Sequence, residues 1–318
     1  MTDELPPAPQ APSAAETRPV NERAPAARGI RRRRRVALWL RRSAWRHAVA
    51  WAACFFALFP IVWIVSAAFN SVDNLAASKL IPSDVTFGNF VEAFTDDVSP
   101  VARWMWNSFY ISVTAAAFNV LVAAWGAYAF SRIKFRGRRT LLTSLLVMQI
   151  FPQFLGFVAF FVLAQEFGDV WAPIGLNTHL FLIVVYLGGA AGFNAFLLKG
   201  FLDSIPTSLD EAAVIDGASS WIIFSRIIMP LARPMLAVIF MISFVAIFGE
   251  FILASFLLKG EDQLTLPVGL QVFLAEGYNA KWGVLAATAL VGAAPVVGVF
   301  LAAQKHIIAG LTGGAVKG

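Results

Sequence analysis

Long apolar runs separated by shorter polar stretches dominate this chain of 318 residues. A helix that crosses a bilayer needs roughly 20 mostly apolar residues. Six runs meet that length, at about 47–69, 106–130, 141–165, 178–199, 233–258 and 282–304. Their apolar residues are continuous rather than alternating, which argues against a β-barrel. The pattern therefore predicts an all-α, polytopic membrane protein with six transmembrane helices.

Basic residues are unevenly distributed among the segments that join these runs. If both termini lie in the cytoplasm, 21 of the 25 lysines and arginines fall on cytoplasmic segments. The outer segments then hold only Lys79, Arg103, Lys259 and Lys281. Because segments rich in lysine and arginine stay on the cytoplasmic side, we predict cytoplasmic N and C termini. The segment 203–230 is then cytoplasmic.

The segment 203–230 is polar, unusually long for a connection between spans, and patterned as two short helices. Pro206 ends the incoming helix, and Ser208 with Glu211 fits a capping box that starts the next one. Gly217 can end that helix in the left-handed conformation without steric cost. Ser219 or Ser220 can cap the second helix, and Pro230 with Pro234 bounds the return into the bilayer. We interpret this as a surface that binds a partner outside the membrane; an amphipathic loop without a partner is the alternative.

Residues 1–46 form a separate leader. The first 30 residues are rich in proline and alanine, which predicts disorder. The cluster Arg31 to Arg35, with Arg41, Arg42 and Arg46, directly precedes the first apolar run. We expect it to fix topology beside anionic lipid, at about 1 kcal/mol per residue, rather than to bind nucleic acid. The first run starts far from Met1 and is long enough to stay as a span, so we predict no cleavable signal peptide.

Composition narrows the class of function. The chain is 58% hydrophobic and 14% charged, with a mean hydropathy of +0.71, and its net charge of +6 comes largely from the leader. No lysine follows a glycine, so a Walker A phosphate loop is absent. Its three histidines, His47, His179 and His306, are scattered, and Cys54 is the only cysteine, so we predict no metal site. We therefore expect no cofactor in this chain and no enzymatic activity.

The polar segment carries a resemblance to a known family. Glu211-Ala212-Ala213, then Gly217 after three residues, Ile227 after nine more, and Pro230 resemble the EAA loop of binding-protein-dependent ABC importer permeases. Gly175 to His179, Tyr186 to Gly189 and the terminal Gly310 to Gly318 are similar to the smaller permease of maltose-type importers. The resemblance covers about residues 50 to 318. It implies a type I ABC importer permease fold in a bacterial cytoplasmic membrane.

The resemblance also implies partners and site residues. The EAA loop would dock on a cytoplasmic dimer of ATPase subunits, which bind the ATP and magnesium. A second, homologous permease would complete the path, and an extracytoplasmic binding protein would deliver the sugar. The implied coupling residues are Glu211, Ala212, Ala213, Asp216, Gly217, Ala218, Ile227 and Pro230. In the tail, 305–318, the implied ATPase contacts are Gly313, Gly314 and Lys317.

Two further regions leave alternatives open. By resemblance, the outer loop 259–281 reaches toward the sugar cleft of the binding protein; otherwise it is a short interfacial helix packed on the protein's own surface. Within the membrane, Glu250 is an acid inside an apolar run, where an exposed charge costs about 2.5–3.5 kcal/mol, so it should face the bundle. We expect it at the permease–permease interface. Gln149, Gln153 and Asn194 could line the path or join helices together.

The leading hypothesis is therefore the permease subunit of an ABC sugar importer. Its favoured substrate is maltose or maltodextrin, with trehalose or another α-glucoside as alternatives. A secondary transporter that works alone is the competing class; inverted repeats and charged residues in mid-membrane would favour it, and neither is evident in the sequence. A membrane scaffold whose loop binds a cytoplasmic partner is the third. Co-purification with an ATPase and a second permease would discriminate among them.

Overall fold

The computed structural model describes residues 44–71, 80–82, 84–96, 99–274 and 281–315, and for 153, 189–191 and 306–315 it describes the backbone alone. Residues up to Pro60 and residues from Ile61 onward form two units. The described residues contain helices and no β-strand, apart from an isolated antiparallel bridge between Asn70 and Val85. The all-α prediction is confirmed.

Four described helices are long and apolar enough to cross a membrane. They are Trp45–Ala68 (α2), Val101–Arg132 (α4), Ser220–Phe248 and the stretch Trp282–Lys305 of α13. A fifth arises if α7 (His179–Asp203), which bends by 49° between Gly188 and Gly192, counts as one span. The number six and the cytoplasmic position of the termini stay predictions.

The third predicted span, 141–165, is broken in the structure. Helix α5 covers Arg138–Met148, a 3-10 turn covers Gln153–Gly156 (η2), and α6 covers Phe157–Val170. Pro152 lies at the break, where it has no N–H to donate and disfavours helix at the residue before it. After α6 the chain turns through η3 (Ala172–Ile174), and Gly168 and Gly175 lie so close that a Cβ on Gly168 would be 2.9 Å from Cα of Gly175.

The fifth predicted span, 233–258, differs at both ends. One continuous helical rod runs through α9 (Ser220–Ile222), the π-helix η4 (Ile223–Ile228) and α10 (Met229–Phe248). It then stops, and a separate helix α11 covers Ile252–Leu257. Pro230 and Pro234 lie within α10 instead of bounding it. The wide π turn directly before Pro230 accommodates a residue that cannot donate a backbone hydrogen bond and that crowds the preceding turn.

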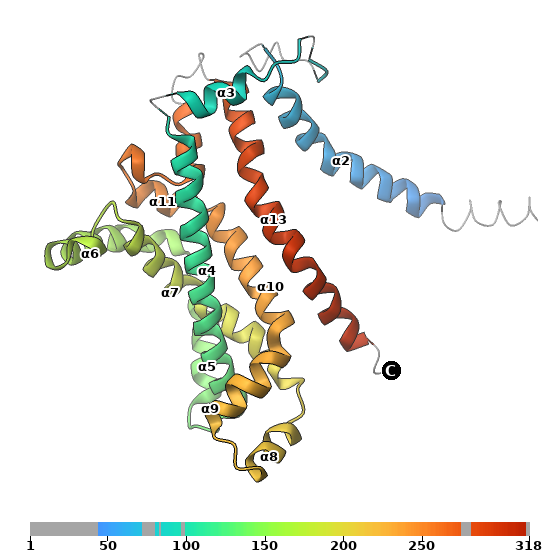
Figure 1. Ribbon diagram of the computed structural model, residues 1–318. Helices are drawn as coiled ribbons and strands as arrows, with labels where there is room; N and C mark the ends of the chain where they lie inside the picture. The colour runs from blue at the N-terminus through green and yellow to red at the C-terminus, as the bar shows by residue number, and fades with distance from the viewer. Residues whose placement is uncertain (1–43, 72–79, 83, 97–98, 275–280, 316–318) are drawn as a thin grey trace, which may run out of the picture. The chain divides into compact units, whose positions relative to one another are not determined.

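Helix α4 lies at the centre of the second unit (Figure 1). Its alanines at 115, 116, 123, 124 and 127 are buried, and a Cβ on Gly126 would meet Ala195 of α7 at 3.3 Å. Small residues thus let α4 pack closely against its neighbours α7 and α10. The two helices run in the same direction, since Tyr110 bonds His179 near one end and Ser131 bonds Asp203 at the other.

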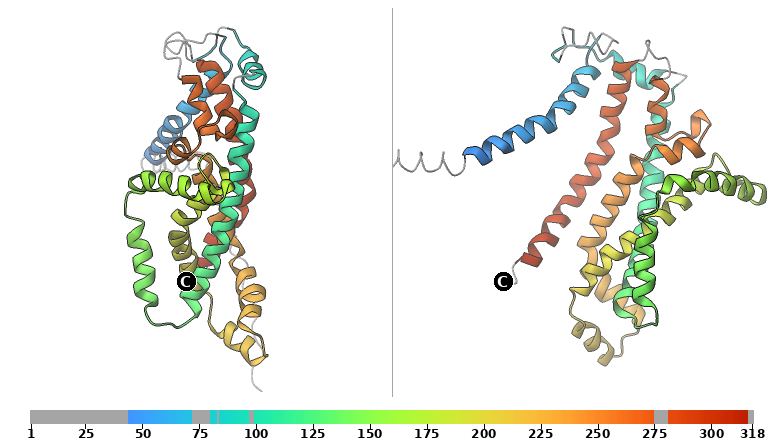
Figure 2. Two further views of the ribbon diagram at one scale, coloured as in Figure 1. Left: turned by 90° about the vertical axis from the view of Figure 1, so that its left-hand side faces the viewer. Right: turned by 180° about the vertical axis from the view of Figure 1, so that it is seen from behind.

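The two ends of α4 carry different connections, as both views of Figure 2 show. Near its start are α3 (Gly88–Thr95) and the outer-loop elements η5 (Glu261–Gln263), α12 (Leu266–Leu270) and η6 (Val272–Leu274). Near its end is α8 (Ser208–Ile215). The loop predicted to bind a partner thus lies at the opposite end of α4 from the outer loop.

The last helix is longer than the predicted span 282–304. Helix α13 extends over Trp282–Ala315 and contains Pro295. Gly313 and Gly314, expected in a short flexible tail, therefore belong to this helix, and Lys317 lies outside the described residues.

Candidate functional site

The candidate site is the segment from α8 to α9, where the predicted short helix α8 ends next to Gly217. The second helix is not short as predicted, because α9 is the start of the continuous helix Ser220–Phe248. Gly217 has a φ of +80°, in the left-handed region. Its N–H donates to the carbonyl of Val214 at 3.0 Å, and the N–H of Ala218 donates to Ala213 at 2.9 Å. These bonds satisfy carbonyls at the end of α8, so the predicted termination is confirmed.

The two predicted caps have different outcomes. Ser219 caps α9, because its hydroxyl accepts from the N–H of Ile222 at 3.4 Å. The capping box of Ser208 and Glu211 is wrong. The chain enters helical geometry at Thr207, so Ser208 is already inside α8, and no side chain caps this end. The acids Asp210 and Glu211 still lie in the first turn, where the helix dipole favours negative charge.

Most of helix α8 is exposed to solvent, but Ala213 is covered by the rest of the chain. Glu211, Ala212 and Asp216 are exposed, and Ile215 is 86% exposed. Ala213 is only 8% exposed, since it packs in the chain's own core with Leu202, Ile205, Ile223 and Phe224. Ala212 is therefore accessible from outside the chain, whereas Ala213 is covered by the chain's own core. The predicted contacts of both alanines with an ATPase stay predictions.

The remaining predicted loop residues support the segment from behind. Ala218 and Ile227 are half-buried and pack against the same core as Ala213. Pro230 is half-buried in the first turn of α10. Trp221, in contrast, is 63% exposed beside α8 in the sequence. The exposed surface is thus narrower than the set of residues named from the sequence.

Sequence reasoning missed the residues that hold α8 in place. Arg132, the last residue of α4, forms an ion pair with Asp210 of α8, with Nε 2.6 Å from Oδ2. The same guanidinium donates from Nη2 to the carbonyl of Ile205 at 2.9 Å. From the sequence alone, Arg132 contributed only to the count of basic residues on cytoplasmic segments. The one sequence feature that could have revealed the pair is an arginine at the end of one predicted span and an aspartate just after the end of another.

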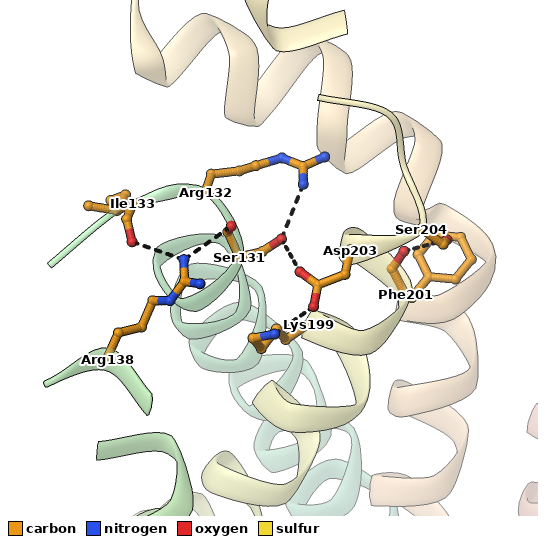
Figure 3. A network of polar contacts seen from close by, with 8 residues as sticks. All are labelled: Ser131, Arg132, Ile133, Arg138, Lys199, Phe201, Asp203 and Ser204. Carbon is orange, nitrogen blue, oxygen red and sulfur yellow. Dashed lines mark hydrogen bonds and ion pairs between the residues drawn. The ribbon is translucent and has the colours of Figure 1, made fainter. Parts of the chain in front are cut away.

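A second set of contacts joins α4 to the end of α7 (Figure 3). Arg132 donates from Nη1 to Ser131 Oγ at 3.2 Å, and Ser131 donates to Asp203 Oδ1 at 2.7 Å. Oδ2 of Asp203 pairs with Lys199 at 2.5 Å. Figure 3 also shows Arg138 beside the carbonyls of Ser131 and Ile133, each at 3.5 Å, and Ser204 bonded to the carbonyl of Phe201 at 2.7 Å.

Glu250 lies at the break between α10 and α11, not within a continuous span. Oε2 accepts a hydrogen bond from the Tyr186 hydroxyl at 2.7 Å and from the N–H of Ala254 at 3.0 Å. Oε1 accepts from the N–H of Leu253 at 2.7 Å. Glu250 thus caps the free amides at the start of α11 and faces the bundle, as the cost of a charge in the bilayer requires.

The other three polar residues predicted within the spans, Asn194, Gln149 and Gln153, lie on different elements of the fold. Asn194 is buried and donates to Ser243 Oγ at 3.0 Å, joining α7 to α10, which favours the alternative of joining helices. Gln149 ends α5 beside Gly192, with its Nε2 3.3 Å from the place a Cβ would occupy there. Gln153 starts η2, and its side chain is outside the described part of the chain. A role of these three residues in lining the path stays a prediction.

The first part of the outer loop is fastened to the chain's own surface. Asn107 of α4 donates from Nδ2 to the carbonyls of Asp262 and Leu264, each at 2.9 Å. Trp104 Nε1 donates to the carbonyl of Glu261 at 2.7 Å, and Ser108 Oγ accepts from the N–H of Leu266 at 2.7 Å. The described part of this loop, 259–274, thus packs on the protein's own surface, and its reach toward a binding protein stays a prediction. Residues 275–280 lie outside the described residues.

The end of the outer loop is held by charge. Lys281 Nζ lies 2.7 Å from Glu92 Oε1 and 3.5 Å from Asp96 Oδ2, at α3. The hydrogen bond to the Glu92 carboxylate raises the pKa of the Lys281 ammonium. Among the described residues, no group of three histidine, cysteine or acidic side chains could hold a metal ion.

Residues 119–309 match a family described as the binding-protein-dependent transport system inner membrane component. GanQ of Bacillus subtilis (strain 168), a galactooligosaccharides transport system permease protein, is 41% identical over 262 residues, 82% of this chain and 90% of GanQ. MalG of Escherichia coli (strain K12), a maltose/maltodextrin transport system permease protein, is 38% identical over 272 residues, 82% of this chain and 91% of MalG.

Two solved structures share the fold. A bacterial ABC transporter involved in the import of the acidic polysaccharide alginate superimposes with a TM-score of 0.67 at 24% identity, over 84% of this chain and 97% of that one. A bacterial alginate ABC transporter in complex with an alginate pentasaccharide-bound periplasmic protein gives 0.61 at 19%, over 84% and 95%. With the sequence identities above, this chain belongs to the family of binding-protein-dependent transport system inner membrane components.

Proposed function

We propose that this chain is the permease subunit of an ABC importer for an oligosaccharide, and that α8 is its docking site for a cytoplasmic ATPase. The observation that carries the proposal is the exposed face of α8, with Glu211, Ala212 and Ile215 outward, on a segment anchored from within the chain. An exposed face that is rigidly held suits transmission of motion from a partner. The family and the curated relatives, which are permease proteins of sugar transport systems, support the same conclusion.

The residues of α8 have different roles in this proposal. Ala212 lets the partner's surface approach closely, Ile215 supplies apolar area, and Glu211 offers a carboxylate to basic groups. An exposed ion pair contributes about 0–1 kcal/mol. Reversing a conformational equilibrium from 1:99 to 99:1 takes about 5.5 kcal/mol. ATP and magnesium on the ATPase dimer, with the loaded binding protein outside, therefore drive the change that α8 conveys.

The proposal places the chain in the bacterial cytoplasmic membrane with three kinds of protein partner. A second, homologous permease shares the translocation path, an extracytoplasmic binding protein delivers the sugar, and the ATPase dimer binds α8. The end of α13, with Gly313, Gly314 and then Lys317, reaches the ATPase subunits. A surface for the second permease near Glu250 is part of the same proposal.

For the substrate we propose a maltodextrin, the sugar named for MalG. Galactooligosaccharides, named for GanQ, are the main competitor, and trehalose is another. Since the binding protein selects the sugar in such an importer, the test is a calorimetric titration of the cognate binding protein. Tight binding of maltotriose supports the proposal, and binding of galactooligosaccharides alone overturns it.

Cysteine cross-linking tests the docking site. The native thiol, Cys54, is exposed and is first changed to serine. The chain is then co-expressed with the ATPase and the second permease. In the resulting complex, single cysteines at Ala212 and Ile215 should cross-link to the ATPase. A cysteine at the inward-facing Ala213 is the matched control and should not. Absence of an ATPase from the purified complex, or capture by position 213 alone, would contradict the proposal.

A further inference from the structure

A single, partly buried arginine connects three elements at one end of the helix bundle. The side chain of Arg132 is 9% exposed and that of its partner Asp210 is 17% exposed. From the end of α4, the guanidinium reaches Asp210 in the first turn of α8 and the carbonyl of Ile205 in the turn between α7 and α8. The attachment of α8 therefore does not depend only on the chain that leads into it.

Asp210 depends on Arg132 for compensation of its charge. Its Oδ1 is buried without a hydrogen-bond partner among the described residues. Its Oδ2 lies 2.6 Å from Arg132 Nε, a contact that is an ion pair without the geometry of a hydrogen bond. A buried carboxylate without a partner is strongly unfavourable, so the pair resists separation. Arginine suits this place because its planar fork presents several donors in fixed directions, which lysine cannot match.

The same arginine is tied to α7 through Ser131 and Asp203. Arg132 donates to Ser131 Oγ, and Ser131 donates to Asp203, the last residue of α7. The outermost pair of this series, Lys199 with Asp203, is more exposed and contributes less. The strong part of the network is therefore the ion pair of Arg132 with Asp210 and the hydrogen bond of Arg132 to the carbonyl of Ile205.

Neighbouring acids on α8 thus face different ways. Glu211 is exposed, whereas Asp210 lies between α8 and α4. One residue is available to a partner, and the next is engaged inside the chain. Binding of α8 and its mechanical attachment can consequently be disrupted separately.

We propose that Arg132 is the positioning residue of this permease: through Asp210 and Ile205 it fixes α8 to the end of α4, so that the two helices move as one body. This inference rests on the proposed function of α8. Without the pair, α8 keeps its exposed docking face but swings about its flanking turns. The ATPase then stays bound while its motion no longer reaches α4.

Distance measurements between spin labels test the proposal. The labels are attached to cysteines at exposed Ser208 of α8 and Trp125 of α4, in a Cys54→Ser chain within the assembled importer. Double electron–electron resonance is recorded without nucleotide and with ATP and vanadate. We expect one narrow distance distribution, with the same mean in both states. A mean that shifts between the two states would overturn the proposal.

Variants separate positioning from stability. Asp210→Asn and Arg132→Gln should each broaden the distribution at least twofold while the amount of bound ATPase is unchanged. Arg138→Gln, the same change at a nearby arginine whose side chain donates to the carbonyls of Ser131 and Ile133, should leave it narrow. The double variant Arg132→Gln with Asp210→Asn removes both buried charges, so its melting temperature should recover while the distribution stays broad. A narrow distribution in the double variant would overturn the proposal.

Failure of the proposed function looks different. In that case no ATPase accompanies the unaltered chain, whatever the width of the distribution. Glu211→Lys provides the complementary result, since it should release the ATPase and leave the distribution between α8 and α4 narrow. A broad distribution in Glu211→Lys would contradict the assignment of separate roles to the two acids.

Discussion

The hydroxyl of Tyr186 on α7 donates a hydrogen bond of 2.7 Å to Oε2 of Glu250, at the point where α10 has ended and α11 has not begun. Both carboxylate oxygens also accept backbone N–H groups of α11. The acid in this apolar run therefore has a structural role, because it satisfies amides that a broken helix leaves free and connects the break to a neighbouring helix.

Tyr186→Phe and Glu250→Gln should both lower stability. Phenylalanine removes a hydrogen bond to a charged group, worth about 1.5–3 kcal/mol. Glutamine keeps one of the two acceptor oxygens and therefore removes part of the helix cap. The expected loss of stability is that of a helix cap, about 0.5–2 kcal/mol. Thermal unfolding in detergent measures both, with Tyr128→Phe, whose hydroxyl makes a longer bond of 3.4 Å, as the control.

Transport by Glu250→Gln separates the charge from the cap. If uptake by this variant equals that of the unaltered chain at every pH, the negative charge has no role in transport. Reduced uptake with unchanged assembly would instead indicate that the ionised carboxylate contributes to the conformational change.

Gly217→Ala tests the left-handed turn between α8 and α9. Because φ is +80° there, a Cβ should cost about 1–2 kcal/mol even though no atom lies within 4 Å of it. Gly217→Pro should be worse, since proline cannot adopt this φ and removes the N–H bonded to Val214. Gly200→Ala within α7, also with open space around it, is the matched control and should be neutral or stabilising.

Limited proteolysis of the 203–230 loop and the yield of co-purified ATPase are the measurements for the Gly217 variants. We expect faster cleavage and less ATPase for Gly217→Pro, with normal membrane insertion. Equal cleavage of the Gly217 and Gly200 variants would show that the turn does not need glycine.

Two side chains of α4 hold Asp262 in different ways, which allows a direct comparison. Asn107 donates to its carbonyl from a buried position, whereas Arg103 pairs with its carboxylate in an exposed one. Asn107→Ala leaves two carbonyls without this donor and should cost about 1–3 kcal/mol. Arg103→Gln should cost about 0–1 kcal/mol. Thermal unfolding and protease cleavage within 261–266 measure the difference, and equal effects would contradict it.

Lys281 should make stability depend on pH only in the alkaline range. Its folded-state pKa is raised by Glu92 above the ordinary 10.5, so its contribution is complete below that value and is lost as the pH rises through the folded-state pKa. Lys281→Gln should therefore reduce the alkaline loss of stability and change nothing in the slope between about pH 6 and 8. Unfolding curves at low and high salt provide the measurement, with a smaller effect at high salt because the pair is partly exposed.

Local backbone chemistry explains what could be predicted from the sequence. The left-handed end at Gly217 and the cap by Ser219 depend on residues a few positions apart. The prolines predicted helix ends less well. Pro152 lies at a break between helices, whereas Pro230 and Pro234 lie inside a helix that contains a π turn just before them. Whether a proline ends a helix depends on how the surrounding residues pack, and a local sequence pattern does not predict that packing.

The site itself required the fold. Ala212 and Ala213 are adjacent and identical, and only the position of α8 against the core decides which one is buried. The helices α5, α6 and α7 lie between Arg132 and Asp210 in the chain, so no spacing in the sequence connects the two residues. The break at Glu250 had a weak local signal, because an acid after Gly249 within an apolar run is suited to starting a new helix.

The unbroken helix from Ser220 to Phe248 gives the molecule a lever. At 1.5 Å per residue its 29 residues extend about 43 Å, with the turn after Gly217 at one extremity and Glu250 just beyond the other. A small tilt of this helix about its end beside α8 produces a much larger displacement of its opposite end. Since that opposite end is fastened to α7 by Tyr186, the displacement would drag a second helix along with it.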